Sequence, residues 1–360
     1  MFALTAARVF FPLDRQMRLR RDSWSEGVVK AVAWLGTTQP SFEIAAETFS
    51  WLVGASMSDT TLWRAHGEVA GKLEQRLGEE EQQLREWAGN EEEENERVAA
   101  QSAIEERASV SVDGVLIRIR EEGYREVKLV SVSEVERVTA SEAVGQVARA
   151  EAQPSLKLVK HSYRAVLGDK GTFEPGLRAE LVRRRVRDAA EITSVNDGAE
   201  WIWDLVGRYL PEERAEVLDW SHAVQNVAKA AAAAFGEGTL EAQAWLAERK
   251  VELWEGRVAA VGAALLRLPR RRGERGRVIR NVLEYIIQHT NRMDYARFRA
   301  EGRPIGSGTV ESGAKNVVQC RMKRGGQSWS SNGARRMLAA LGELHSGRWE
   351  GTYRRLAKAA

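Results

Sequence analysis

Residues 108–120 read ASVSVDGVLIRIR, and this stretch decides the fold class. Valine or isoleucine stands at 110, 112, 115, 117 and 119, between polar neighbours, which is typical of a β-strand. Further strands are predicted at 126–135, 162–167, 192–195 and 217–220, with helices at 181–190, 201–209 and from Ser221. Three strands followed by alternating helices and strands predict an α/β domain with a mixed central sheet.

Helical patterns flank this domain on both sides. Before it, apolar residues recur at helical spacing over 42–52, Gly54 ends that helix, and Ser58 or Asp59 can cap the next one. Two helices joined by a short glycine-containing turn are the pattern of a helix-turn-helix, although any helical hairpin shows it. After it, residues 228–300 read as helices, followed by a glycine-rich loop at 302–308 and helices at about 310–324 and 331–345.

The charge is segregated along the chain although the formal net charge is only +3. Nine glutamates lie between residues 79 and 96, and basic runs lie at 183–187, 270–277 and 321–324. Runs of like charge are most often solvated faces or linkers. Three basic runs in the C-terminal half nevertheless favour a polyanionic partner, and arginine suits bidentate contacts with phosphate.

Composition excludes several classes of protein. The chain has 360 residues, of which 29% are charged, and no apolar run approaches the ~20 residues that a membrane helix needs. The single cysteine, Cys320, excludes an intramolecular disulfide framework and a multi-cysteine zinc site. We therefore expect a cytoplasmic protein without zinc.

Three carboxylates stand out by their positions. Asp113 lies in the middle of an apolar strand, Asp197 follows a strand, and Glu311 opens a helix after a glycine-rich loop. Each has an ordinary alternative explanation, because Asp-Gly is a common turn and glutamate favours helix N-termini. Together they can hold a pair of divalent metal ions of the kind that serves phosphoryl transfer, without cysteine or histidine.

Motif strings along nearly the whole chain resemble those of one family. They are FPLD (11–14), SDTTLWR (58–64), SVDG (111–114), NDGAEWI (196–202), LDWSHA (218–223), RMDY (292–295), PIGSGTVES (304–312), and RMKR (321–324) followed by Trp329-Ser330. With these strings the chain resembles bacterial insertion-sequence transposases of the DDE type, in the Kra-type group related to mutator-like transposases. The 304–330 group is the most specific of them.

The resemblance implies an α/β, RNase H-like catalytic core with a mixed sheet, interrupted by an all-helical insertion and preceded by a helix-turn-helix-like domain. Asp113, Asp197 and Glu311 would be catalytic and would bind Mg²⁺ or Mn²⁺, as two ions. Asp219 and His222 match an Asp-x-x-His motif that would support this site or contact DNA; the alternative is a helix-capping aspartate and a packed histidine. Relatives often carry a cysteine-rich zinc segment ahead of FPLD, and no cysteine stands there in this sequence.

The resemblance also implies a domain plan and a DNA-contacting set. The plan is a helical DNA-binding domain at 1–78, an acidic helical linker at 79–106, the core at 107–227, the helical insertion at 228–300, and the rest of the core at 301–360. The residues expected to contact DNA are Thr60, Thr61, Arg64, Lys315, Arg321, Lys323 and Arg324.

A transposase would hydrolyse a phosphodiester at each element end and then transfer the freed strand into target DNA. Its partners would be double-stranded DNA, as terminal repeats and target, and further copies of the chain in a homodimer or larger complex near the nucleoid; no membrane partner is expected. Two alternatives stay open from the sequence. One is an RNase H-like nuclease or resolvase, and the other is a catalytically silent DNA-binding protein derived from a transposase.

Overall fold

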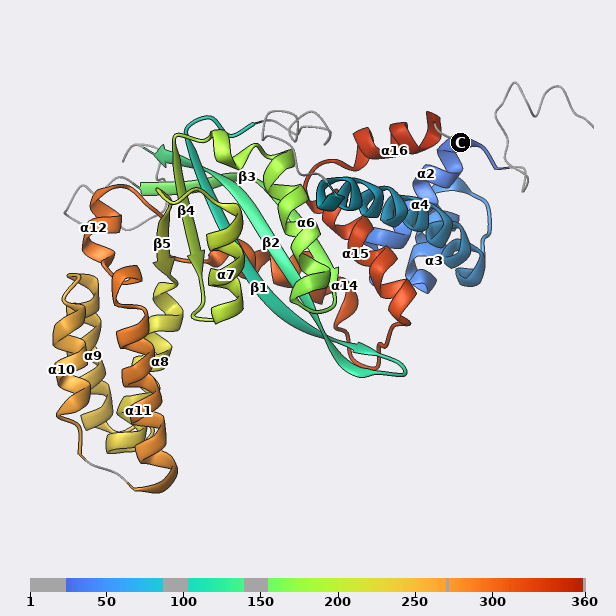
Figure 1. Cartoon of the computed structure of the whole chain (residues 1–360). Helices are drawn as coiled ribbons and strands as arrows, with labels where there is room; N and C mark the ends of the chain where they lie inside the picture. The colour runs from blue at the N-terminus through green and yellow to red at the C-terminus, as the bar shows by residue number, and fades with distance from the viewer. Residues whose placement is uncertain (1–23, 87–102, 139–154, 270–271, 359–360) are drawn as a thin grey trace, which may run out of the picture.

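The computed structural model describes residues 24–86, 103–138, 155–269 and 272–358. Within these ranges the protein is an α/β structure built around one mixed five-stranded sheet, as predicted (Figure 1). One group of helices lies at the right of the sheet in Figure 1 and another projects from its left side. The FPLD string, residues 87–102 of the acidic run and Arg270-Arg271 lie outside the described residues.

The sheet has the strand order β3-β2-β1-β4-β5. Strands β1, β2 and β3 form an antiparallel meander, while β4 and β5 run parallel to β1. Their bounds are Arg107–Ile119 for β1, Gly123–Val138 for β2, Ser155–Leu167 for β3, Glu191–Asn196 for β4 and Ala215–Leu218 for β5. The carboxyl ends of β4 and β5 therefore point the same way as that of β1.

The two faces of β1 pack into different cores, and both faces are buried from Ala108 to Val112, whereas only one face is buried after Gly114. Val110 and Val112 belong to a cluster with helices α6 (Lys170–Arg183) and α7 (Glu200–Tyr209). Val115, Ile117 and Ile119 belong to a cluster on the opposite face, which contains Val310 and Leu338. Because side chains alternate along a strand, Asp113 shares a face with Val115 and thus with the C-terminal helices.

The C-terminal helices cover that second face. They are α13 (Gly308–Gly313), a π-helical segment η3 (Ala314–Gln319), α14 (Cys320–Met322) and α15 (Ser331–His345), and α16 (Trp349–Lys358) ends the described chain. The single helix predicted from 310 to 324 is therefore three consecutive segments. Between α14 and α15, the backbone of Trp329 pairs with β1 at Arg118 and Arg120.

One predicted helix was misplaced. The helix expected at 181–190 is α6, which begins at Lys170 and ends at Arg183, followed by a 3₁₀ turn η1 (Val186–Asp188). Gly171, Pro175 and Gly176 lie inside α6. Glycine and proline have the lowest helix propensities, so the composition of this segment hid the helix.

The N-terminal helices are α2 (Glu26–Thr38), α3 (Phe42–Val53) and α4 (Asp59–Glu86). Gly54 ends α3 in the left-handed conformation, as its position in the sequence indicated. Helix α2 was not among the predicted elements. Helix α4 continues without a break across the predicted boundary at residue 78, so its acidic end is part of a helix that begins in the N-terminal group.

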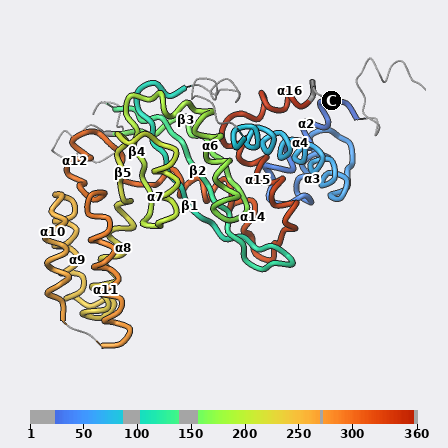
Figure 2. The backbone as a smooth tube through the Cα atoms, viewed as in Figure 1, coloured from blue at the N-terminus to red at the C-terminus, as the bar shows by residue number. Residues whose placement is uncertain are grey.

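The helical insertion begins directly after β5. It consists of α8 (Trp220–Phe235), α9 (Leu240–Trp254), α10 (Val258–Leu266), α11 (Gly273–Gln288), a 3₁₀ turn η2 (Thr290–Arg292) and α12 (Tyr295–Ala300). Its apolar core is continuous with the sheet, because Val195, Val217 and Leu218 belong to the same cluster as Val227 and Ile286. The tube in Figure 2 shows α8 and α11 side by side, leading away from β5.

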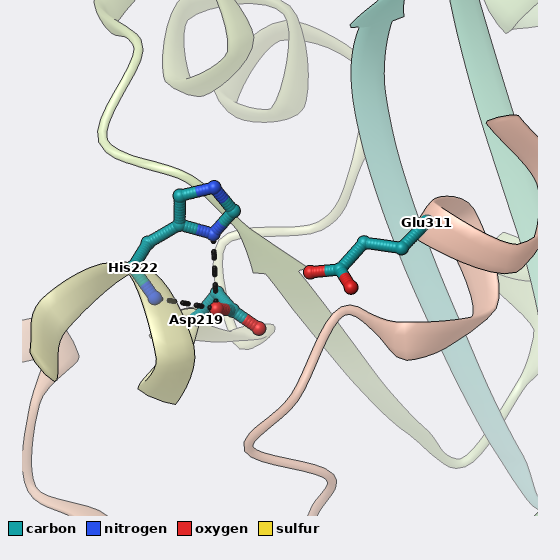
Figure 3. Close-up of side chains that lie close together, drawn as sticks. All are labelled: Asp219, His222 and Glu311. Carbon is teal, nitrogen blue, oxygen red and sulfur yellow. Dashed lines mark hydrogen bonds and ion pairs between the residues drawn. The ribbon is translucent and has the colours of Figure 1, made fainter. Parts of the chain in front are cut away.

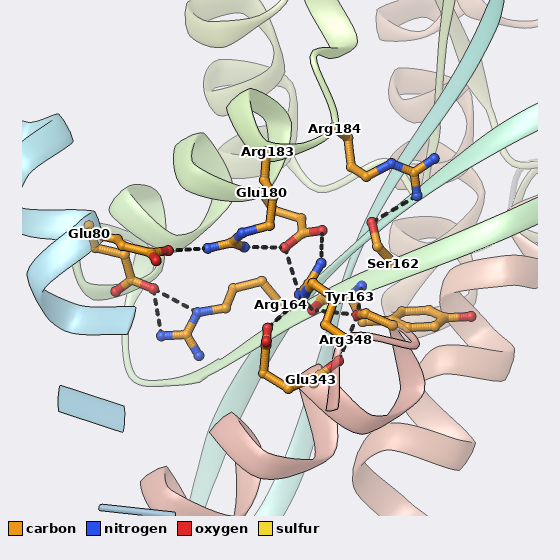
Figure 4. Close-up of polar contacts among 12 residues, drawn as sticks. Glu80, Ser162, Tyr163, Arg164, Glu180, Arg183, Arg184, Glu343 and Arg348 are labelled. Carbon is orange, nitrogen blue, oxygen red and sulfur yellow. Dashed lines mark hydrogen bonds and ion pairs between the residues drawn. The ribbon is translucent and has the colours of Figure 1, made fainter. Parts of the chain in front are cut away.

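A buried ion network joins α4 to the sheet (Figure 4). Arg183 on α6 pairs with Glu80 on α4 and with Glu180, each at 2.7 Å, and Arg164 on β3 pairs with Glu81 at 2.6 Å. Arg348 completes the network by binding Glu180 at 2.8 Å and Glu343 at 2.7 Å.

The arginines of this network lower the pKa of its buried glutamates. Burial raises the pKa of Glu180, but the charges of Arg348 and Arg183 outweigh it and hold the pKa below its usual range. Arg184, which is fully buried, donates to the Lys160 carbonyl and to Ser162. The basic run beginning at Arg183 is thus internal over its first two residues and does not form a DNA surface there.

Within the described ranges, every helix is too short or too polar to cross a lipid bilayer.

Candidate metal centre

Asp113 lies where β1 passes from burial on both faces to burial on one face. Its Oδ1 accepts the backbone N–H of Gly114 at 2.7 Å. The pKa of Asp113 is raised to about 6, chiefly by burial and also by the negative charges of Asp197 and Glu311, while the Gly114 N–H and the charge of His222 oppose the rise. Three residues from distant parts of the sequence, Asp197, His222 and Glu311, therefore influence this carboxyl group.

Asp197 is held at the end of β4 by its neighbour in the sequence. Asn196 is fully buried, and its Oδ1 accepts the backbone N–H of Val112 at 2.7 Å while its Nδ2 donates to Ser194 at 2.8 Å. This side chain continues the β1–β4 pairing to the residue directly before Asp113. Asp197 itself accepts the Ala199 N–H at 2.9 Å, so the loop after β4 holds both the residue and its carboxylate.

Asp219, His222 and Glu311 meet beside this loop (Figure 3). Each offers one ligand atom, and these atoms lie within 4.8 Å of one another. Asp219 Oδ1 accepts the backbone N–H of His222 at 2.8 Å and lies 2.9 Å from its Nδ1. Asp219 Oδ2 accepts the backbone N–H of Ser307 at 2.7 Å, and the Ser307 hydroxyl lies 2.9 Å from that oxygen and 3.3 Å from Glu311 Oε1.

These contacts give Asp219 a different role from the other three carboxylates. Burial raises its pKa, but the hydrogen bonds from His222 and Ser307 outweigh it and lower the pKa overall. The hydrogen bond to Asp219 raises the pKa of His222, against the effect of burial, and the charges of Asp219, Asp197 and Glu311 raise it further. Because both Asp219 oxygens already accept hydrogen bonds, Asp219 ties the start of α8 to the loop before α13.

The remaining carboxylates suit a hard divalent cation. Asp113 and Asp197 are half-buried and Glu311 is exposed, and within the described part of the chain no lysine or arginine forms a salt bridge with any of them. Carboxylate oxygens that repel one another and raise a neighbour's pKa are the donor set that Mg²⁺ or Mn²⁺ neutralises. The chemistry of the three predicted ligands thus suits such an ion, but among the described residues the group whose ligand atoms lie within 4.8 Å of one another is Asp219, His222 and Glu311, without Asp113 and Asp197.

The structure distributes the predicted DNA-contacting residues over two regions. Thr60 and Arg64 are exposed near the start of α4, while Thr61 bonds to the capping residue Ser58 through both its N–H and its hydroxyl. Lys315 is exposed on η3, one turn beyond Glu311, and Lys323 and Arg324 are exposed at the end of α14.

Arg321 does not fit the predicted role. Its side chain is 4% exposed, and its guanidinium donates to the carbonyls of Gly36 and Pro40 at 3.2 Å each. It also lies over the rings of Phe42 and Trp329. Arg321 therefore joins the N-terminal helices to the C-terminal segment and is not available to DNA, which corrects the prediction from the RMKR string.

A groove runs along α4 beside the exposed residues Thr60 and Arg64. It has a volume of about 740 Å³ and lies between α4 and α15, with Arg64, Lys72 and Arg336 among its lining residues. A second hollow of about 350 Å³ adjoins it and is lined by Thr60, Arg120 and Trp329 among others. Both hollows share Trp63, so one continuous depression with basic and aromatic walls extends from the start of α4.

The sequence missed the residues that hold the carboxylates in place. Asn196 and Ser307 lie inside the quoted strings, but nothing in a string distinguishes a ligand from the residue that orients it.

No protein-family model matches the chain, and a comparison with curated proteins finds no significant match.

Proposed function

We propose that this protein is a DNA transposase of the DDE type, with an RNase H-like core that cleaves phosphodiesters and transfers strands with the help of divalent metal ions. The observation that carries the proposal is that the charges of Asp197, after β4, and of Glu311, on α13, both act on Asp113 of β1, while Glu311 lies beside Asp219 and His222. Because the whole helical insertion separates Glu311 from the two aspartates, this grouping is not a by-product of local structure.

The sheet supports the same proposal. A three-stranded antiparallel meander followed by two parallel strands, with the first aspartate on β1 and the second after β4, agrees with the arrangement that the family resemblance implies. The glutamate then follows a helical insertion between β5 and α13. Helix α3, the turn at Gly54 and helix α4 correspond to the proposed helix-turn-helix.

Asp113, Asp197 and Glu311 would hold two Mg²⁺ or Mn²⁺ ions, which would supply charge stabilisation for the attacking and leaving oxygens of an in-line displacement. The chain's own contribution is positioning. Asp219 binds the backbones of His222 and Ser307, which fixes the two segments that flank the insertion relative to each other. His222, whose pKa is raised by its hydrogen bond to Asp219, lies beside Asp219 and Glu311.

The DNA would follow the exposed basic residues outside this centre. Thr60 and Arg64 open α4 above the basic groove, and Lys315, Lys323 and Arg324 lie on the segment that begins with Glu311. Contacts with phosphate from both regions would position a duplex end without specifying its sequence, and base contacts would come from the start of α4.

The test is a cleavage and joining assay on duplexes made from the genomic DNA that flanks the gene, with Mg²⁺ or Mn²⁺. We expect cleavage and strand transfer from the wild-type chain, and neither from Asp113→Asn, Asp197→Asn or Glu311→Gln. Asp204→Asn is the matched control, because Asp204 is an exposed aspartate on α7 that pairs with Lys170.

The two alternatives give different results in the same assay. Cleavage without joining would indicate a nuclease or resolvase. Duplex binding without cleavage in either metal would indicate a silent DNA-binding protein and would overturn the proposal.

A further inference from the structure

Gly198, directly after Asp197, is required for a reason that the Asp-Gly pattern does not reveal. A Cβ atom built on Gly198 would lie 2.1 Å from Cε2 of Tyr285 and 2.7 Å from its Cζ and hydroxyl oxygen. The φ angle of Gly198 is not in the left-handed region, so its backbone would accept an alanine. It is therefore the ring of Tyr285, and not the turn, that excludes a side chain at this position.

Tyr285 reaches this loop from the helical insertion. It lies on α11, more than eighty residues along the chain, and its ring packs edge-on against His289 with the centroids 4.8 Å apart. Burial raises the pKa of Tyr285, as do the charges of Asp197 and Asp219, while Asn226 and the Gly198 N–H lower it. The charges of Asp197 and Asp219 thus reach the buried Tyr285 hydroxyl, which makes no hydrogen bond among the described residues.

His289 supports the ring from behind. It is 1% exposed, and it lies between Tyr285 and Trp203, whose ring centroid is 6.3 Å away. Burial lowers its pKa, as does the charge of Arg292, while a contact with the Gly198 backbone and the charge of Asp197 oppose the change. The Gly198 backbone therefore lies near Tyr285 of α11 and near His289, which directly follows this helix.

We propose that Tyr285, supported by His289, is a positioning residue that fixes the direction of the Asp197 carboxylate, so that the helical insertion is a working part of the metal centre. The inference rests on the proposed function, because it takes Asp197 to be a metal ligand. The loop after β4 has its own hydrogen bond from Ala199, and the Tyr285 ring packs against Gly198, the residue between Asp197 and Ala199.

A merely structural contact makes a different prediction. If Tyr285 only packs in the core of the insertion, then changing it or Gly198 lowers stability and leaves the affinity for metal unchanged. If it positions Asp197, the affinity for metal falls even in variants that stay folded. Residues that orient metal ligands typically affect metal affinity by about 10- to 100-fold.

The test measures the Mn²⁺ dissociation constant of the full chain from the electron paramagnetic resonance signal of free Mn²⁺. We expect Gly198→Ala to weaken binding by about tenfold or more. Tyr285→Leu should weaken binding to a similar degree, and the double variant, in which the added methyl group has room but the ring is absent, should bind no better than Tyr285→Leu alone. Gly262→Ala on α10 is the matched control, because a Cβ atom there meets nothing within 4 Å.

The outcomes separate the inference from the function on which it rests. Wild-type binding that is lost in Asp197→Asn but unchanged in both Gly198→Ala and Tyr285→Leu would overturn the inference and leave the proposed function standing. Equal binding by wild type and Asp197→Asn would overturn both. If Gly198→Ala does not fold, Tyr285→Leu alone decides, since unchanged Mn²⁺ affinity in that variant would overturn the inference.

Discussion

Asp113 combines a half-buried position with two neighbouring negative charges, and its proton affinity makes the centre sensitive to pH. In the metal-free chain its pKa is raised to about 6 from an ordinary 3.8. A raised carboxyl pKa means that the folded state favours the proton. The corresponding stabilisation is present below about pH 4 and is lost as the pH rises through 6.

We therefore expect the free energy of unfolding of the metal-free chain to fall by at most about 3 kcal/mol between pH 4 and 7 because of this group. Asp113→Asn, which stays neutral, should remove that part of the pH dependence. Urea unfolding of both chains with a chelator present measures the difference. Parallel curves for the two chains would show that Asp113 lies apart from the other carboxylates.

Arg321 and Arg324 are three residues apart in one basic string and have opposite environments. Arg321→Ala should lower the free energy of unfolding by about 2–3 kcal/mol, because buried backbone carbonyls lose a charged donor and two rings lose their cation. Lys323→Ala and Arg324→Ala should change it by less than about 0.5 kcal/mol.

Lys323 and Arg324, which are both exposed, should instead affect DNA binding. Each phosphate contact that is lost should reduce the slope of log affinity against log salt by about 0.9. Fluorescence anisotropy of a labelled duplex at several salt concentrations measures this slope. If the slope stays the same in the Lys323→Ala/Arg324→Ala variant, these two residues belong to a solvated face.

At this scale the sequence pointed to individual residues but not to the contacts that each of them makes. An acidic residue in an apolar strand is conspicuous because burying it is costly, and Asp113 was found in that way. Arg321 was misjudged because a run of charges does not say which member points inward. Tyr285 and His289 carried no signal at all, since an aromatic residue on an amphipathic helix is usually part of a core.

Among the elements, α13 shows how closely a helix carrying a candidate ligand approaches the sheet. A Cβ atom on Gly313 would lie 2.5 Å from the Tyr163 ring and 3.2 Å from Leu129. The helix then continues as the π-helical segment η3, and such segments occur often at functional sites.

Gly313→Ala should push α13 away from the sheet. We expect a loss of about 1–3 kcal/mol in the free energy of unfolding, together with weaker Mn²⁺ binding because Glu311 moves with the helix. Gly308→Ala at the start of α13, where a Cβ atom meets nothing within 4 Å, is the control. A stability loss with unchanged Mn²⁺ affinity would mean that Glu311 does not depend on the depth of this helix.

The elements themselves were predictable where one period dominated. Strand β1, helix α7 and the α3–α4 hairpin follow their apolar patterns, and the mixed sheet follows from their order. Helix α6 was misplaced because proline and glycine interrupt it, and η3 could not be foreseen because π-helical and α-helical segments share the same residues. A helical pattern also does not indicate which distant helix will touch a loop, so the contact of α11 with Gly198 required the structure.

For the whole molecule, the ion network predicts that the N-terminal helices and the sheet unfold together. Glu80 and Glu81 pair with Arg183 and Arg164. Replacing both glutamates with glutamine leaves arginines without these partners, and we expect it to lower the free energy of unfolding by about 2–4 kcal/mol. Calorimetry of the wild-type chain should show one transition for these two parts.

Glu79→Gln is the control, because this exposed residue bonds only to the Gln75 side chain among the contacts of the described residues. A wild-type chain that melts in two separate steps, with the Glu80→Gln/Glu81→Gln variant affecting neither, would show that α4 is attached to the sheet only weakly.

The continuity of α4 also limits how this protein can be divided for recombinant work or exchanged with related chains. A fragment that ends at residue 78 would lose Glu80 and Glu81, and a fragment that begins at residue 107 would keep Arg164 and Arg183 without them. Neither fragment would be a faithful substitute for its part of the intact chain. A chimera that borrows foreign N-terminal helices should therefore be joined after Glu86, and it should keep acidic residues at the two positions that face β3 and α6.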